Sequence, residues 1–218
     1  MAGDREGISR RQLLLGAVAA SAGAVIAACT RRSPQTTQAA PTAQPSATSA
    51  AGRLDPTPTC DDDDEPTPEQ TEGPYFTPSS PEKTDLAADV GNRGTKLVLT
   101  GAVLSTTCKP VGRALVDFWQ ADDDGNYDNE GYTLRGHQFT DDRGRYTLTT
   151  VVPGLYPGRT RHIHVKVQAP DSPVLTTQLY FPGETQNLSD GIYRQECEIA
   201  TQDVADGKTG RFDFVIAT

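Results

Sequence analysis

Two histidines separated by one residue are the most chemically informative feature of this sequence. The chain contains only three histidines, and two of them form His162-Ile163-His164. In a β-strand alternate side chains point to the same face, so the two imidazoles would project together while Ile163 faces the core. Two imidazoles on one face can bind one metal ion, although the same pattern also occurs on ordinary protein surfaces.

Two tyrosines in glycine-rich loops are candidates for further ligands. Tyr127 follows the turn-rich stretch 119–126, and Tyr156 stands in the stretch 153–159, Pro-Gly-Leu-Tyr-Pro-Gly-Arg. A deprotonated tyrosine is a hard anionic ligand that favours a ferric ion over softer divalent metals. The usual alternative for a tyrosine is a half-buried ring with a satisfied hydroxyl. A metal-dependent hydrolase is less well supported, because no Asp or Glu lies beside the histidine pair.

Five short stretches together resemble the intradiol ring-cleavage dioxygenases, the family of catechol 1,2-dioxygenase and protocatechuate 3,4-dioxygenase. They are Glu69-Gln70-Thr71-Glu72-Gly73-Pro74-Tyr75, Val116-Asp117-Phe118-Trp119-Gln120-Ala121-Asp122 leading to Gly125-Asn126-Tyr127, Leu134-Arg135-Gly136 with Thr140-Asp141, Gly158-Arg159-Thr160-Arg161-His162-Ile163-His164, and Leu175-Thr176-Thr177-Gln178. Each stretch alone is a weak signal, whereas their order and spacing are specific. The resemblance covers about half of the chain.

The resemblance implies a single ferric ion, Fe(III), bound by two tyrosines and two histidines, namely Tyr127, Tyr156, His162 and His164. It also implies that Arg159 faces the substrate, that Gln178 lies behind the site, and that Tyr75 lines the substrate pocket. Tyr156 would be both a departing ligand and the base that accepts a substrate proton. The implied reaction inserts both atoms of O2 into a catechol-type aromatic and opens its ring between the hydroxyls, giving a cis,cis-muconate-type dicarboxylic acid.

The charges of these ligands suit that reaction. A ferric ion with two phenolates and one hydroxide is neutral overall. A catechol that gives its two protons to the hydroxide and to Tyr156 would replace both as a dianion. No net charge would then be stranded in a buried site, where it is costly.

Departures from the family pattern leave the substrate and the oligomeric state open. The spacer between Tyr156 and Arg159 is short, Gln120 stands where relatives often have histidine, and Arg161 replaces a proline or a small residue. The substrate could be catechol, protocatechuate, hydroxyquinol or a lignin-derived fragment. The main alternative function is a non-catalytic, prealbumin-like β-sandwich binding module, which the stretch from 139 to 157 also resembles.

The elements that must position these residues are short strands. Apolar and β-branched runs at 97–104, 113–119, 138–140, 145–151, 162–167, 175–181 and 211–216 alternate with Gly, Asp and Pro turns. This spacing, without a long helical period, predicts an all-β fold, a β-sandwich of mixed or antiparallel sheets with long active-site loops. A short helix is expected only within 190–206.

The N-terminal part has the pattern of an export signal. Arg10-Arg11 precedes an apolar run that ends at Cys29, which predicts a twin-arginine lipoprotein signal peptide over residues 1–28 and lipidation of Cys29. Residues 29–66 are rich in Thr, Pro, Ala, Ser and acidic residues, which predicts a disordered linker before a domain at 67–218. The protein is then expected to be exported, and to meet a membrane only through its lipid anchor.

Composition narrows the partners further. The formal net charge is −9, and no basic stripe exists to neutralise phosphates, so nucleic-acid binding is not expected. Besides Cys29 the chain has Cys60, Cys108 and Cys197. Outside the cytoplasm one disulfide is plausible, but the sequence does not choose the pair.

Overall fold

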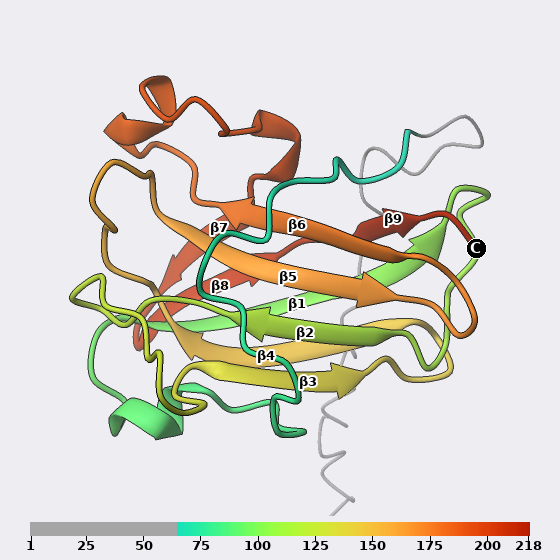
Figure 1. Cartoon of the computed structure of the whole chain (residues 1–218), viewed down its shortest axis with the longest axis horizontal. Coiled ribbons are helices and arrows are strands. Elements are labelled where there is room, and N and C mark those ends of the chain that lie inside the picture. The colour runs from blue at the N-terminus through green and yellow to red at the C-terminus, as the bar shows by residue number, and fades with distance from the viewer. Residues whose placement is uncertain (1–64) are drawn as a thin grey trace, which may run out of the picture. The chain divides into compact units, whose positions relative to one another are not determined.

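Two β-sheets make up most of residues 65–218, the part of the chain that the computed structural model describes. The larger sheet has the order β4 (Arg145–Val151), β1 (Lys96–Ser105), β8 (Gly207–Arg211) and β7 (Ala200–Val204), with β9 (Phe214–Ile216) also paired to β1. The smaller sheet has the order β3 (Arg135–Phe139), β2 (Leu115–Trp119), β5 (His162–Gln168) and β6 (Val174–Tyr180) (Figure 1). Three short 3-10 helices complete the described elements, η1 (Ala87–Val90), η2 (Thr185–Leu188) and η3 (Gln195–Cys197).

Mixed strand pairing confirms the predicted class of β-sandwich. β1 runs parallel to β8 and β9, whereas the other strand pairs are antiparallel. The core lies between the sheets, where Leu97, Leu99, Ile163, Val165 and Val167 have no exposed surface. Burying apolar surface of this kind contributes roughly 25 cal/mol per Å². Because side chains alternate along β5, the residues between these core positions point to the other face of the smaller sheet.

The C-terminal region departs from the expectation in two ways. The predicted strand at 211–216 is divided into the end of β8 and β9. The short helix expected within 190–206 is limited to the 3-10 helix η3, and β7 follows it. β7 and β8 form a hairpin that closes at Val204 and Gly207. Ala205 and Asp206 form the two-residue turn, and Gly207, which begins β8, has φ +135° and lies against Lys96 O.

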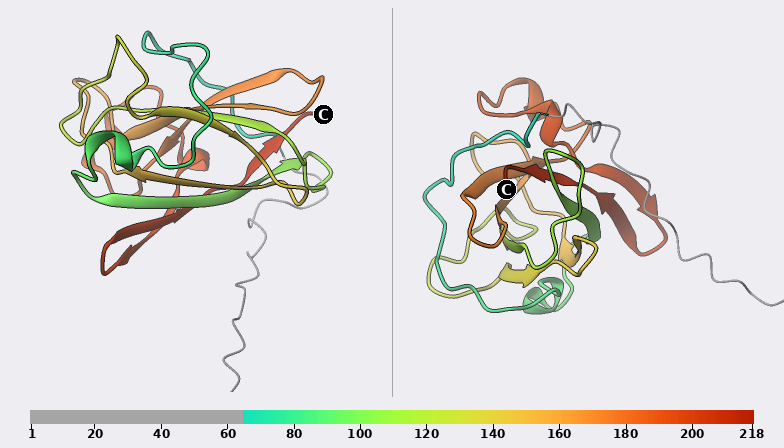
Figure 2. Two further views of the ribbon diagram at one scale, coloured as in Figure 1. Left: turned by 90° about the horizontal axis from the view of Figure 1, so that it is seen from below. Right: turned by 90° about the vertical axis from the view of Figure 1, so that its right-hand side faces the viewer.

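An extended segment crosses the outer face of the smaller sheet, and we call residues 66–86 the strap. The backbone amide of Gln70 donates to Thr176 O of β6 at 2.8 Å, and that of Lys83 donates to His137 O of β3 at 3.0 Å. Since β6 and β3 are the two edge strands, the strap spans the whole sheet (Figure 1). Figure 2 shows it on the side of this sheet that faces away from the larger one.

The described cysteines answer part of the disulfide question. Cys108 is disulfide-bonded, and its partner lies outside the described residues. Cys197 is free and fully buried. The predicted signal peptide, Cys29 and nearly all of the linker also lie outside the described residues. Within residues 65–218, no helix is long and apolar enough to cross a membrane.

Candidate metal centre

The histidine pair lies at the beginning of β5, on the face covered by the strap. His162 and His164 are 5% and 3% exposed, and their ring centroids are 4.8 Å apart. Gly73 of the strap lies over His164, and a Cβ at this position would come within 3.3 Å of its Cε1 atom. The predicted placement of both imidazoles on one face is confirmed, and the strap shields them from solvent.

One predicted tyrosine ligand, Tyr127, lies against this pair, and the other, Tyr156, lies against Tyr127. Tyr127 Oη is 3.1 Å from His162 Nε2, and the Tyr127 ring centroid is 5.9 Å from that of Tyr156 and 6.1 Å from that of His164. Two atoms bound to one metal at about 2.1 Å and at right angles lie about 3 Å apart. The separation of Tyr127 Oη and His162 Nε2 therefore fits two ligands of one ion.

Two glycines bring the tyrosine loops together. A Cβ on Gly154 would lie 2.3 Å from the backbone nitrogen of Gly125, and a Cβ on Gly125 would lie 2.3 Å from Leu155 O. The loop before Tyr127 therefore packs backbone against backbone on the loop before Tyr156. Asp122 supports the contact, because its Oδ1 accepts the amide of Asn126 at 2.8 Å and its carbonyl accepts the amide of Gly154 at 2.6 Å.

Both histidines are held as neutral imidazoles. His162 Nδ1 donates to Thr160 O at 2.6 Å, which leaves the lone pair on Nε2, the atom that faces Tyr127. Burial lowers the pKa of His162 to about 4. Burial, and next the neighbouring His162, lowers the pKa of His164 well below its ordinary value. His164 is also stacked on Trp119, with ring centroids 4.9 Å apart and planes 7° apart.

The donor set fits a ferric ion. Burial raises the pKa of Tyr127 well above its ordinary value, although Arg159 and Arg135 oppose this, so a phenolate here requires a strong cation close by. Among residues 65–218, the one group of three or more His, Cys, Asp or Glu residues placed to hold a metal is Asp122, Asp123 and Asp124. The histidine pair therefore has no carboxylate partner of the kind that a facial triad or a catalytic zinc site uses.

Tyr75 contacts both candidate tyrosine ligands. Its hydroxyl is 2.6 Å from that of Tyr156, and its ring is stacked on Tyr127 with centroids 4.5 Å apart. The backbone oxygen of Tyr75 accepts a hydrogen bond from Arg135 Nη1. The sequence places Tyr75 only in the wall of a pocket, whereas the structure gives it a direct hydrogen bond to a candidate ligand.

Arg159 and Gln178, the other predicted site residues, are hydrogen-bonded to each other. The amide of Arg159 donates to Tyr156 O at 3.0 Å, and Gly158 between them has φ +78°, which is a type II turn with Pro at its second position. Arg159 Nη2 donates to Gln178 Oε1 at 2.7 Å. Gln178 is fully buried, and its Nε2 donates to Thr71 O of the strap at 2.9 Å.

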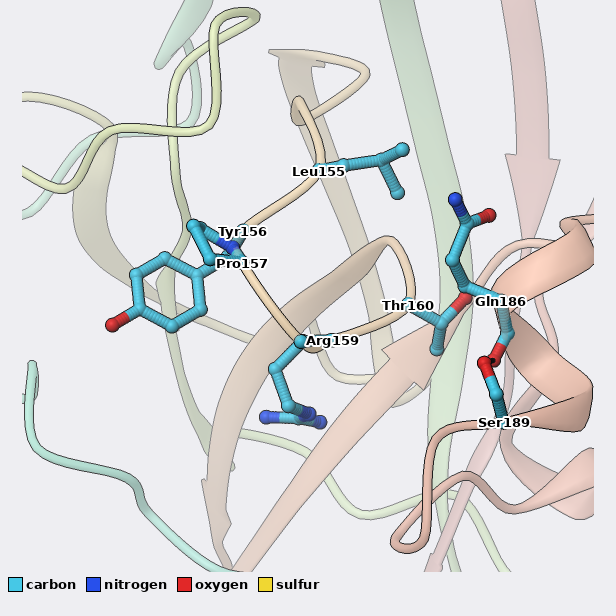
Figure 3. Close-up of a pocket in the computed structure, with 8 residues that line it drawn as sticks. Leu155, Tyr156, Pro157, Arg159, Thr160, Gln186 and Ser189 are labelled. Carbon is cyan, nitrogen blue, oxygen red and sulfur yellow. Dashed lines mark hydrogen bonds between the residues drawn. The ribbon is translucent and has the colours of Figure 1, made fainter.

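A pocket of about 400 Å³ lies beside this turn. Its lining residues include Leu155, Tyr156, Arg159, Gln186 and Ser189 (Figure 3). Figure 3 shows the Tyr156 ring and the Leu155 side chain on opposite sides of the loop. The pocket lies between this loop and η2, and Tyr156 and Arg159 both line it.

Two residues that support the site through hydrogen bonds were missed by the sequence reasoning. Asp190 Oδ2 accepts Arg159 Nε at 2.8 Å and the amide of Thr160 at 2.9 Å. Arg135 is 1% exposed, and it links the Tyr127 loop, through Asp128 O, to Tyr75 of the strap. No local pattern distinguishes Asp190 from a surface aspartate, whereas Arg135 stands in one of the family-like stretches and could have been singled out.

Comparison with known proteins decides the family. The family model described as "Dioxygenase" matches residues 71–216. The chain belongs to the intradiol ring-cleavage dioxygenase family. It is 34% identical over 125 residues to the beta chain of protocatechuate 3,4-dioxygenase from Burkholderia cepacia, an alignment that covers 49% of this chain and 53% of the relative.

Solved structures agree with this family assignment. The dioxygenase domain of a dioxygenase and carbohydrate-binding fusion protein from Streptomyces sp. SirexAA-E is 52% identical, with a TM-score of 0.69 over 71% of this chain and 99% of that domain. The 3-chlorocatechol 1,2-dioxygenase of Rhodococcus opacus 1CP is 27% identical, with a TM-score of 0.65 over 70% of this chain and 73% of that protein. The chain spans about half the length of the curated relatives it matches, 53% and 50% for two of them.

The departures from the family pattern have structural partners. Gln120 is buried, and its Nε2 donates to Val151 O at 2.8 Å. Arg161 Nε pairs with Glu184 Oε1 at 2.8 Å, and its Nη1 donates to Pro153 O. These side chains hold the loops around the site, and their recorded hydrogen bonds do not involve the four candidate ligands.

Proposed function

We propose that this chain is an exported iron(III) dioxygenase that opens a catechol-type ring between its two hydroxyls. The observation that carries the proposal is the cluster of two half-buried phenols and two buried, neutral imidazoles on the outer face of the smaller sheet. The reaction needs no other reactant, because catechol and O2 together contain every atom of the dicarboxylic acid product. Both atoms of O2 enter the product, and the carbon–carbon bond between the hydroxyl-bearing carbons breaks.

The chain would hold iron through Tyr127, Tyr156, His162 and His164. When bound, ferric iron supplies an electron-withdrawing centre that activates the catecholate ring toward O2. Tyr156 accepts one catechol proton at Oη and turns away from the centre. Tyr75 is suited to assist this movement, because its hydroxyl lies 2.6 Å from Tyr156 Oη and can hydrogen-bond the protonated tyrosine.

Arg159 supplies positive charge on the substrate side. Its side chain is 21% exposed and lines the pocket together with Tyr156. A fixed guanidinium stabilises negative charge that develops on the substrate, and it does so most strongly where water is excluded. The strap and the two tyrosine loops provide this exclusion, because they leave the histidines almost without solvent contact.

Purified protein provides the first test. We expect about one iron per chain and a red-brown colour, because phenolate-to-iron(III) charge transfer absorbs visible light. Catechol, protocatechuate and hydroxyquinol should be offered in parallel, with O2 uptake and muconate-type absorbance as readouts. Tyr127→Phe is the matched control and should lose colour. A colourless protein that holds stoichiometric zinc and cannot be reconstituted with iron would overturn the proposal.

We also propose that the mature protein is anchored outside the cytoplasm through a lipid on Cys29. The support is the arginine pair, the apolar run and the polar stretch of residues 1–66. Cells making the wild-type chain should carry it in the membrane fraction, and Cys29→Ala should move it to the soluble fraction. Wild-type protein that stays in the soluble cytoplasm with Met1 retained would contradict the anchor.

A further inference from the structure

Asp190 is a buried carboxylate that none of the proposed chemistry uses. Its side chain is 2% exposed. Oδ2 accepts the amide of Thr160 at 2.9 Å, and Oδ1 accepts the amide of Ile192 at 3.1 Å. Two backbone amides therefore fix the carboxylate on both of its oxygens, so its position is set by the chain rather than by its own side-chain torsions.

The fixed carboxylate holds Arg159. Asp190 Oδ2 accepts Arg159 Nε at 2.8 Å, while Gln178 Oε1 accepts Nη2 at 2.7 Å. Among residues 65–218, no recorded hydrogen bond involves Arg159 Nη1. Burial raises the pKa of Tyr180, and the Arg159 guanidinium, which also interacts with the Tyr180 hydroxyl, opposes this rise. A planar guanidinium held at two of its three nitrogens cannot rotate, and the third nitrogen is left to bind another molecule.

We propose that Asp190 is a positioning residue that, together with Gln178, aims Arg159 Nη1 at the aromatic substrate. The inference rests on the proposed function, because it concerns how the same site binds the catechol-type substrate. Without the carboxylate, Arg159 would keep its charge and one hydrogen bond but could swing about its long side chain. A guanidinium that is not preorganised stabilises developing charge less, so turnover should suffer more than folding.

The replacement Asp190→Asn tests the carboxylate. An asparagine amide cannot accept hydrogen bonds on both atoms, so it must lose either the pair of bonds at Oδ2 or the Ile192 amide. In the iron-loaded full chain we expect kcat to fall at least about tenfold, with iron content unchanged. The affinity for 4-nitrocatechol, measured without O2 by the absorbance of this ligand, should fall at least about threefold.

A double-mutant cycle with Arg159→Met separates positioning from general destabilisation. If Asp190 acts through Arg159, Asp190→Asn should change kcat and 4-nitrocatechol affinity by less than about twofold in the Arg159→Met background. Equal losses of kcat in both backgrounds would overturn the inference, because a structural role adds independently of Arg159. If Asp190→Asn does not accumulate as folded protein, the same cycle is run with Asp190→Glu.

The chain contains a matched control for the loss of a buried aspartate. Asp213 has a side chain that is 1% exposed and pairs with Arg211 at 2.8 Å, and its Oδ1 accepts the amide of Ala102 at 2.8 Å. It lies in the link between β8 and β9 of the larger sheet, away from the metal centre. Asp213→Asn should lower the melting temperature without the loss of kcat that is expected for Asp190→Asn.

Failure of the proposed function would be distinguishable from failure of this inference. In the first case the wild-type chain itself holds no iron and cleaves none of the catechols. In the second case the wild type does both, and Asp190→Asn either matches Asp213→Asn in kcat and stability or shows no coupling to Arg159.

Discussion

Two tyrosines that serve as candidate ligands are held very differently. Tyr127 lies with its hydroxyl against His162 and its ring under Tyr75, and Asp128 next to it is tied to the buried Arg135. Tyr156 belongs to the exposed type II turn with Gly158, and its one recorded side-chain hydrogen bond goes to Tyr75. Tyr127 is therefore held in place, whereas Tyr156 can move away from the metal centre without disturbing the strand that carries the histidines.

Replacing each tyrosine by phenylalanine should separate these roles. Tyr156→Phe should keep iron bound through three ligands but lose one charge-transfer band and a proton acceptor, so that catechol turns over far more slowly. Tyr127→Phe should reduce iron retention and colour more strongly. Stopped-flow absorbance with catechol, first without O2 and then with it, measures both effects. Cleavage by Tyr156→Phe at the wild-type rate would mean that Tyr156 is neither ligand nor base.

Asp117 provides a pH-dependent test of the strap. Burial raises the pKa of its carboxyl, although the hydrogen bond from Ser80 and nearby positive charges oppose this. A raised folded-state pKa means that the folded chain holds this proton more tightly than the unfolded chain does. The contribution of Asp117 to stability is therefore present below the ordinary Asp pKa of about 4 and is lost as pH rises through the folded pKa.

Replacement of Asp117 by asparagine should remove that pH dependence. Ser80 Oγ donates to Asp117 Oδ1 at 2.7 Å, and an amide oxygen can accept the same bond. We expect the melting temperature of Asp117→Asn, relative to wild type, to be higher at pH 8 than at pH 4. A difference between the two proteins that is equal at both pH values would show that this carboxyl does not titrate differently on folding.

At the scale of elements, the metal centre depends on two loops that touch through glycine backbones. Neither Gly125 nor Gly154 can carry a side chain without a collision with the opposite backbone. Such a contact has no flexible atom that could give way, so the whole loop must move. Movement of either loop changes the distance between Tyr127 and Tyr156.

Gly154→Ala should therefore damage both stability and iron binding. Overpacking of this kind costs typically about 1–3 kcal/mol, and the displaced tyrosines should lower the iron content and shift the charge-transfer band. Gly191→Ala is the matched control, because a Cβ there meets nothing within 4 Å. Thermal unfolding and iron analysis of both variants make the comparison. A Gly154→Ala protein with wild-type iron content would show that the contact does not set the site.

The strands were predictable, because hydrophobic alternation is local. It placed Ile163, Val165 and Val167 in the core and so placed His162 and His164 on the opposite face. The ligand set came from the resemblance to the family, since no periodicity places Tyr127 near Tyr156. Asp190 and the Gly125–Gly154 contact could not be predicted, because both depend on segments that meet only after folding. The short helix expected within 190–206 is limited to η3, because the hairpin of β7 and β8 begins at Ala200.

At the scale of the whole described domain, the chemistry and the core lie on opposite faces of one sheet. The inner face of β5 packs in the sandwich, while the outer face holds the histidines beneath the strap. Changes at the metal centre therefore need not disturb the hydrophobic core. The strap contacts both the larger sheet and the metal centre. Thr67 N donates to Val215 O of β9 at 2.8 Å, and Gly73 lies over His164.

The same hydrogen bond has a consequence for how the domain can be joined to other modules. Thr67 and Val215 are joined by two hydrogen bonds, since the amide of Val215 also donates to Thr67 Oγ1 at 2.9 Å. Figure 1 shows the C-terminus at the end of the smaller sheet opposite the tyrosine loops. The first described residues and the C-terminus therefore lie together, at that end of the smaller sheet. Fusion of a soluble protein after Thr218 should leave kcat/KM within about twofold of the unfused chain, whereas the same insertion at Gly191, next to Asp190, should not. Loss of activity on the C-terminal fusion would contradict this geometry. An anchor before the domain and a fused protein behind it could therefore be exchanged without covering the tyrosine loops.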